Sequence, residues 1–181
     1  MQWTVKQVRT LLEARPFAVQ AIDLIDNRKK KELNYPFYRL KAPDWVNVLA
    51  ITEGQKAVLV KQQRVGTMTD TLEIPGGVID EGEDPKVAAI RELEEETGYR
   101  AKRVEHVATI NPNPAIMTNN VHMFVALDCA IPQDRKLFPD ENESIDIITC
   151  DVKELIPKTL NQEINSALAA LTIHMCRDYF S

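Results

Sequence analysis

Short runs of apolar residues, either continuous or alternating with polar residues, recur along most of the chain. They are separated by turns rich in glycine, proline and charge. Runs of this length and pattern are typical of β-strands. They predict strands at residues 17–25, 35–41, 45–52, 56–62, 71–74, 102–110, 121–129 and 145–152.

Apolar residues spaced three or four positions apart mark other segments. This spacing places their side chains on one face of a helix. It predicts helices at residues 3–14, 85–97 and 160–176, with a shorter helical turn at 152–156. Strands followed by a helix, more strands and a last helix are typical of an α+β fold or an α/β/α sandwich.

The predicted helix at 85–97 has clear signals at both ends. Asp84 suits the N-cap because its side-chain oxygen accepts from the free amides of the first turn. Pro85 suits the first helical position, where its missing N–H costs nothing, and Gly98 suits the left-handed conformation that ends a helix. At about 100° per residue the helix has two faces. We expect the apolar face, formed by Val87, Ile90 and Leu93, to lie in the core. The opposite face carries the carboxylates of Glu92, Glu95 and Glu96.

The three carboxylates of this helix repel one another. Like charges at such spacing destabilise an isolated helix by about 0.2–0.5 kcal/mol. A divalent cation offsets the repulsion, and hard cations such as magnesium are held by a few carboxylates plus substrate phosphates. A solvated acidic face is the alternative. The wider pattern favours a metal–diphosphate site, because Gly77 to Tyr99 reads G-x5-E-x7-R-E-L-x-E-E-x-G-Y without a gap.

Composition narrows the class of protein. The 181 residues suffice for one domain with a sizeable core, and 44% hydrophobic and 27% charged residues are typical of a soluble globular protein. The net charge of −5 argues against general nucleic-acid binding, and no stretch approaches the length of a membrane span. No signal-peptide core is present, and the cysteines lack metal-type spacing. We therefore expect a cytoplasmic protein with reduced core thiols, at Cys129, Cys150 and Cys176.

The segment from Gly76 to Tyr99 resembles the box of the Nudix hydrolase family at every motif position. The flanking segments resemble the branch that contains nucleoside-diphosphate-sugar and ADP-ribose pyrophosphatases. The resemblance implies a mixed sheet between helices, with an antiparallel strand extension at the N-terminus. It also implies a single Nudix domain over 1–181, with the box at 76–99 and residues 1–45 contributing to a homodimer.

The resemblance also implies a magnesium site in the box, with manganese as a substitute. The implied ligands are the Gly76 carbonyl and the carboxylates of Glu92, Glu95 and Glu96. Glu95 bridges or assists in catalysis, and Arg91 orients the carboxylates or the loop as a planar donor. Glu83 is expected to anchor the loop to the helix. Diphosphate cleavage needs charge neutralised on two phosphates and a water placed in line, and bound metal ions serve both needs.

Candidates outside the box complete the expected site. A base or water-orienting carboxylate is expected in the acidic segment that ends at Glu143, which is favoured over Glu141; an exposed acidic turn is the alternative. Arg64 resembles the family's phosphate-contacting arginine. Trp45 is assigned either to stacking on a nucleobase or to the core, and Glu73 either to supporting the site or to an ordinary strand end. The remaining candidate substrate contacts are Arg39 and Pro114.

The chemistry points first to a metal-dependent pyrophosphatase that hydrolyses a nucleoside diphosphate sugar, such as ADP-ribose or GDP-mannose, to a nucleoside monophosphate and a sugar phosphate. A Nudix hydrolase of nucleoside triphosphates or dinucleoside polyphosphates is the alternative within enzymes. Two other classes stay open: a non-catalytic nucleotide-sugar sensor and an acidic cation-binding domain. The complete box favours the first function.

Overall fold

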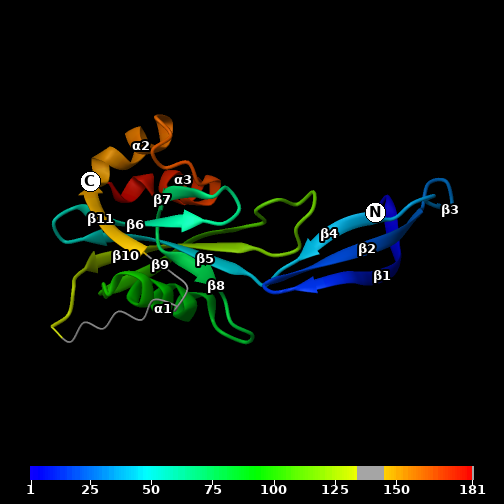
Figure 1. The fold of residues 1–181 in the computed structure, drawn as a ribbon, viewed down its shortest axis with the longest axis horizontal. Helices are drawn as coiled ribbons and strands as arrows, with labels where there is room; N and C mark the ends of the chain where they lie inside the picture. Colours follow the sequence, from blue (N-terminus) through cyan, green and yellow to red (C-terminus); the bar gives the residue numbers. More distant parts are fainter. Residues whose placement is uncertain (134–144, 181) are drawn as a thin grey trace. The chain divides into compact units, whose positions relative to one another are not determined.

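The structure is a computed structural model that describes residues 1–133 and 145–180. The chain forms two compact units. Unit 1 consists of residues 1–44 and 110–120, and unit 2 of residues 45–109 and 121–181. The box lies entirely within unit 2 (Figure 1).

A mixed sheet forms the centre of unit 2, in the order β11-β6-β5-β10-β9, with β7 on β6 and β8 on β5. The strand β5 pairs in parallel with β10 and antiparallel with β6 and β8. The strands span Trp45–Thr52 (β5), Lys56–Arg64 (β6), Thr69–Glu73 (β7), Gly76–Val78 (β8), Arg103–Ile110 (β9), Val121–Cys129 (β10) and Ile145–Asp151 (β11). The predicted strands of this sheet are all present, and the prediction of an α+β fold with a mixed sheet is confirmed.

Helices cover both faces of this sheet, with α1 (Pro85–Thr97) on one side and α2 (Val152–Leu160) and α3 (Ala167–Met175) on the other (Figure 1). Residues of β5 alternate between two cores because successive side chains of a strand point to opposite faces. Val46, Val48 and Ala50 pack with α1, whereas Leu49 and Ile51 pack with α2 and α3. A short 3-10 helix, η1 (Arg177–Tyr179), follows α3.

The ends of α1 are as predicted. Asp84 accepts hydrogen bonds from the backbone amides of Lys86 and Val87, and Gly98 closes the helix with a φ of 67°. The prediction of its apolar face was correct for Leu93, which is buried, but wrong for Val87 and Ile90, which are exposed. Ala88 and Ala89 pack in the core with β5 instead, and their small size lets the helix approach the sheet closely. The buried residues of the helix are Ala88, Ala89, Leu93, Glu96 and Thr97.

The N-terminal segment is a strand and not the predicted helix. β1 (Trp3–Ala14) pairs antiparallel with β2 (Phe17–Asp26), with register shifts between Val5 and Gln7 and between Thr10 and Leu12. Each shift adds one residue to the strand, as a β-bulge does. The added residues stretch an alternating pattern until its apolar positions fall three or four apart, which explains the wrong prediction.

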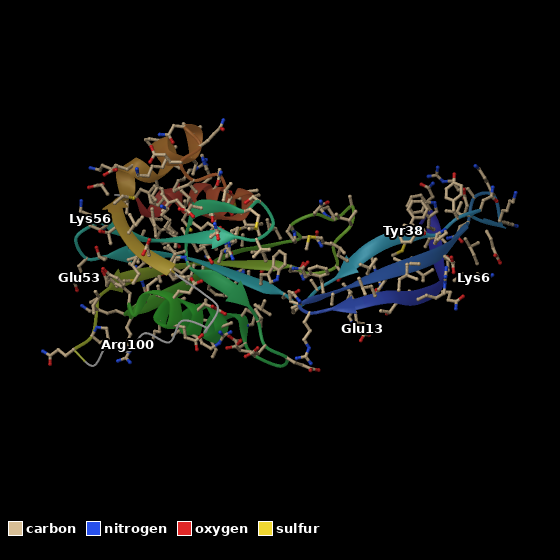
Figure 2. The ribbon with its side chains drawn as sticks, viewed as in Figure 1. Lys6, Glu13, Tyr38, Glu53, Lys56 and Arg100 are labelled. Atoms are coloured by element: carbon tan, nitrogen blue, oxygen red, sulfur yellow. The ribbon has the colours of Figure 1, made fainter. Side chains whose placement is uncertain are left out.

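Unit 1 is built on β1 and β2 with two further strands, β3 (Lys31–Glu32) and β4 (Phe37–Lys41), both antiparallel to β2. The segment 111–120 joins this unit at β4, where the Leu40 amide donates to the Ile116 carbonyl at 2.7 Å and the Thr118 amide to the Leu40 carbonyl at 3.1 Å. These strands form the predicted antiparallel N-terminal extension. Figure 2 labels Lys6, Glu13 and Tyr38, whose side chains project from them.

The C-terminal prediction was correct in type but not in extent. The segment 160–176 was expected as one helix, yet α3 begins only at Ala167 and α2 precedes it. Asp151 and Glu154 form a capping box that starts α2. The chain then turns at Asn161 before Ser166 begins α3.

The three cysteines are buried and free, as expected. Burial raises the pKa of the Cys129 thiol and of the Cys176 thiol to about 12 each, so both stay protonated. Within residues 1–133 and 145–180, no helix has the length and apolar character needed to span a membrane.

Candidate functional site

The turn from β8 into α1 brings backbone and helix carboxylates together. β8 pairs antiparallel with β5, so that Gly77 lies opposite Val46 and Gly76 opposite Asn47. The Gly76 amide donates to Oε2 of Glu96 at 3.0 Å. A Cβ at Gly77 would overlap the Glu92 carboxylate. The Glu92 carboxylate therefore occupies the space that a side chain at Gly77 would take, and a Cβ at Gly76 would overlap the Val46 carbonyl oxygen.

Arg91 connects the loop to the helix. Its Nε and Nη2 donate to the two carboxylate oxygens of Glu83, each at 2.9 Å, and Nη2 also donates to the Val78 carbonyl at 3.1 Å. Glu83 in turn accepts from the Asp80 amide at 3.1 Å. The Arg91 guanidinium holds the pKa of Glu83 below its ordinary value, and Glu83 raises that of Arg91. Glu83 thus anchors the loop to the helix, as expected.

The same guanidinium reaches two of the predicted metal ligands. Nη1 of Arg91 donates to Glu92 at 2.7 Å and to Glu95 at 3.1 Å. Such charge-assisted contacts hold both carboxylates in fixed orientations. The geometry therefore supports the positioning role expected for Arg91.

The donor set of this turn suits a hard divalent cation. Glu92, Glu95 and Glu96 offer only carboxylate oxygens, which are the donors that magnesium and manganese prefer. The space beside Gly77 admits the Glu92 carboxylate only because a Cβ is missing. In the described part of the chain, no three acidic, histidine or cysteine side chains converge closely enough to be recognised as a metal site. The carboxylates of Glu92 and Glu95 converge instead on Arg91.

A pocket of about 290 Å³ lies beside this turn, within unit 2. It gathers four of the predicted site residues, Trp45, Arg64, Glu73 and Gly76. Its wall at Gly76 and Gly77 is the same backbone that Glu96 and Glu92 contact from α1. We call this cavity the Arg64 pocket, and we call the turn from β8 into α1 with Glu92, Glu95 and Glu96 the carboxylate turn. The two share the backbone of Gly76 and Gly77 as a common wall.

Arg64 is held in this pocket by a carboxylate. Its Nε and Nη2 donate to the two oxygens of Glu73, at 2.9 and 3.2 Å, and the Thr71 hydroxyl donates to Oε1 of Glu73 at 2.6 Å. Burial favours the neutral acid, but the hydrogen bonds from Arg64 and Thr71 outweigh it, so the pKa of Glu73 lies below its ordinary value. Arg64 retains 45% of its side-chain exposure, whereas Glu73 retains 12%. The largely buried Glu73 therefore holds the guanidinium of Arg64 in position at the wall of the pocket.

Trp45 is partly exposed, so it is not the buried core tryptophan of the alternative. Arg39 and Pro114 belong to unit 1, where Nε of Arg39 donates to the Gln20 side chain at 2.9 Å. Glu143 and Glu141 lie outside the described residues.

The sequence reasoning missed several residues of this site. Asn47 and Ser166 line the pocket, and Thr71 holds Glu73. The wrong boundary of the last helix placed Ser166 inside a helix. A serine just before an apolar run is a typical N-cap, and this signal would have placed it at the start of α3.

Comparisons with known proteins agree with this geometry. The NUDIX domain model matches residues 42–171. The ADP-ribose pyrophosphatase of Bacillus subtilis (strain 168) is 30% identical over 173 residues, covering 91% of this chain and 90% of the relative. The methanol dehydrogenase activator of Bacillus methanolicus is 31% identical over 134 residues, covering 74% and 72%. A crystal structure of an ADP compounds hydrolase superposes with a TM-score of 0.85 at 23% identity, covering 99% of this chain and 94% of the other, which supports the fold. The carboxylate helix, the glycine turn and these matches together show that the chain belongs to the Nudix family.

Proposed function

We propose that this protein is a divalent-metal-dependent pyrophosphatase that hydrolyses the diphosphate of a nucleoside diphosphate sugar. The products are a nucleoside monophosphate and a sugar phosphate. The observation that carries the proposal is the wall shared by the Arg64 pocket and the carboxylate turn, which brings a cation-binding donor set beside an anion-binding side chain. The relationship to an ADP-ribose pyrophosphatase supports the substrate class.

The metal is assigned to the carboxylate turn. Glu92 and Glu96, with Glu95 and the Gly76 carbonyl, would hold magnesium, with manganese as a substitute. The bound ion would neutralise phosphate charge and lower the pKa of a coordinated water. The protein's own part is to fix the carboxylates, which Arg91 does for Glu92 and Glu95.

The substrate is assigned to the pocket. Arg64 presents a planar cation suited to a phosphate, and its two hydrogen bonds to Glu73 fix the orientation of the guanidinium. Trp45 offers an aromatic face for a nucleobase. Glu143 remains the proposed base or water-orienting carboxylate, and Arg39 and Pro114 remain proposed substrate contacts.

The decisive experiment is a comparison of Glu96→Gln with the wild-type enzyme on a panel of nucleotide sugars, nucleoside triphosphates and dinucleoside polyphosphates. Products are separated by ion-exchange chromatography in the presence of magnesium or manganese. We expect monophosphate release from nucleotide sugars to fall by up to about a hundredfold in the variant, because a proposed metal ligand is lost. Near-normal turnover by a folded Glu96→Gln enzyme would contradict the metal assignment.

The panel also separates the alternatives. Faster hydrolysis of triphosphates or dinucleoside polyphosphates than of any nucleotide sugar would favour the other enzymatic function. Tight binding of ADP-ribose without product release would favour a sensor.

We also propose a cytoplasmic homodimer that uses unit 1. Beyond its first residue, β1 carries large exposed apolar side chains: Val5, Val8, Leu11 and Leu12. An exposed apolar strand of this length is unusual in a monomer, because it invites pairing and burial against another chain. The three free, buried thiols fit a reducing compartment.

A further inference from the structure

A second pocket lies in unit 1, at the end of the sheet where β2 turns into β3, and its volume is about 360 Å³. Its lining combines aromatic and cationic side chains, namely Trp3, Tyr35 and Phe37 with Lys29 and Lys31. It is called here the hairpin-tip pocket. Small-molecule pockets span about 300–1,000 Å³, so its size suits a single nucleotide better than a larger ligand.

The aromatic part of the hairpin-tip pocket is preformed. The rings of Trp3 and Phe37 lie with centroids 5.4 Å apart and planes inclined by 38°. Both side chains stay more than two-fifths exposed, at 44% and 41%. Ring faces that are held in place but open to solvent are suited to stacking on a planar base.

The cationic part stands out in an acidic protein. Four consecutive residues, 28–31, are arginine or lysine, although the chain as a whole carries a net charge of −5. The two acids of the pocket are already engaged. Glu32 accepts from Lys6 at 2.6 Å, and Oδ1 of Asp26 accepts from the amides of Arg28 and Lys29 at 2.9 and 3.2 Å.

The two lysines differ from these acids within the part of the chain that the structure describes. Among the described residues, neither Lys29 nor Lys31 forms an ion pair closer than 4.0 Å. The Asp26 carboxylate fixes the turn that presents them, since it accepts from two consecutive turn amides. Two cations on a fixed turn, beside exposed ring faces, match a ligand with a phosphate at one end and a base at the other.

We propose that the hairpin-tip pocket binds a nucleoside monophosphate, with the base stacked on Trp3 and Phe37 and the phosphate between Lys29 and Lys31. This site is separate in sequence from the box and the Arg64 pocket, and all of its residues belong to unit 1. A monophosphate is also the nucleotide product of the proposed reaction, so occupancy of this pocket would report product concentration to unit 1.

The test is calorimetric titration of AMP into the full-length protein, with EDTA present to suppress metal-dependent binding elsewhere. Lys29→Glu/Lys31→Glu removes the cations of the pocket. Lys41→Glu/Arg15→Glu is the matched control, because it makes the same change in net charge at two other exposed positions of unit 1. We expect the pocket variant to weaken AMP binding by about tenfold or more, and the control to leave it within about twofold.

Two further arms identify the contacts. Trp3→Leu should weaken AMP binding without changing that of ribose 5-phosphate, and ribose 5-phosphate should bind wild type about tenfold more weakly than AMP. Circular dichroism confirms that each variant is folded, and Lys29→Gln/Lys31→Gln repeats the test with a milder change.

The proposal is overturned if wild type shows no AMP binding, or if the pocket and control variants lose affinity equally. It is also overturned if Arg64→Ala abolishes the AMP signal, which would place the ligand in unit 2. A single-stranded oligonucleotide that binds more than about a hundredfold tighter than AMP would identify nucleic acid as the ligand instead.

Discussion

The box and the first strand of unit 1 differ in whether their side chains find partners within the same chain. In the box, the charged side chains of Glu83, Arg91 and Glu92 meet one another within the same 23 residues. Along β1, the apolar side chains of Val5, Val8 and Leu12 are more than two-fifths exposed. The first region is completed by its own sequence, whereas the second presents surface that only another molecule can bury. Loss of a box residue should therefore impair chemistry, and loss of a β1 residue should impair association.

The largest expected effect is that of Gly77→Ala. Its Cβ would overlap the Glu92 carboxylate, so the carboxylate or the turn must move. A misplacement of about 1 Å in a catalytic group costs about a hundredfold in rate, and we expect at least that loss in kcat with the fold retained. Steady-state kinetics and circular dichroism measure the two. Gly66→Ala is the control, because a Cβ there would meet no atom within 4 Å. Equal kinetics of both variants would show that the carboxylate position is not critical.

The next largest effect concerns association. Val8→Glu places a charge on the apolar face of β1, where Val8 is 41% exposed. A buried unpaired charge is strongly unfavourable, so we expect the dimer dissociation constant to rise by about a hundredfold or more. Analytical ultracentrifugation across a dilution series gives the constant. If the wild-type protein is a monomer at all concentrations, the proposed role of unit 1 is wrong.

The arginine at the centre of the box should have a smaller effect on stability. Arg91→Lys loses the paired contacts with Glu83, and hydrogen bonds to charged groups contribute about 1.5–3 kcal/mol each. Because Arg91 is 28% exposed and a lysine retains one contact, we expect a loss of about 2 kcal/mol in the free energy of unfolding. Arg100→Lys is the matched control, since its pair with Glu94 is exposed on both sides and should contribute little. Urea denaturation of both variants gives the comparison.

The smallest expected effect is a pH dependence at Glu73. Since the pKa of Glu73 is lowered in the folded state, its contribution to stability is fully present above the ordinary value of 4.5 and is lost as pH falls through the folded-state pKa. Glu73→Gln should remove this contribution and flatten the acid side of the stability curve below about pH 4.5. Urea midpoints measured between pH 3 and pH 7 test this. If the urea midpoints of Glu73→Gln fall with pH as steeply as those of the wild type, Glu73 is not the source of the pH dependence.

The box was the most predictable part of the fold because its signals are local. Asp84, Pro85 and Gly98 fix the ends of α1 by their own backbone chemistry, and β5 and β10 were predicted to the residue. The face of α1 was less predictable, since Ala88 and Ala89 pack against the sheet while the larger Val87 and Ile90 do not. The hydrophobicity and size of the side chains alone do not show which face of the helix packs closely against the sheet.

The first strand escaped prediction for a different reason. Its bulges between Val5 and Gln7 and between Thr10 and Leu12 depend on pairing with β2, which periodicity within one segment does not contain. Arg64 and Glu73 were each named as candidates from the sequence, but their ion pair was not predicted, because it depends on the antiparallel pairing of β6 with β7. Thr71 was missed because its contact with Glu73 exists only after that pairing, and Ser166 was missed because the last helix was predicted to begin too early.

The pairing of strand β5 determines how a misfolded form of this protein can be detected. Val46, Val48 and Ala50 pack in the core with α1, whereas Leu49 and Ile51 pack in the core with α2 and α3. Val46 and Asn47 also lie opposite the two glycines of β8. A slip of one residue along this strand would exchange both sets of side chains at once. No partly folded form with a slipped β5 can then keep the glycine turn in place, so enzymatic turnover can serve as a direct readout of correctly aligned molecules in a refolding mixture.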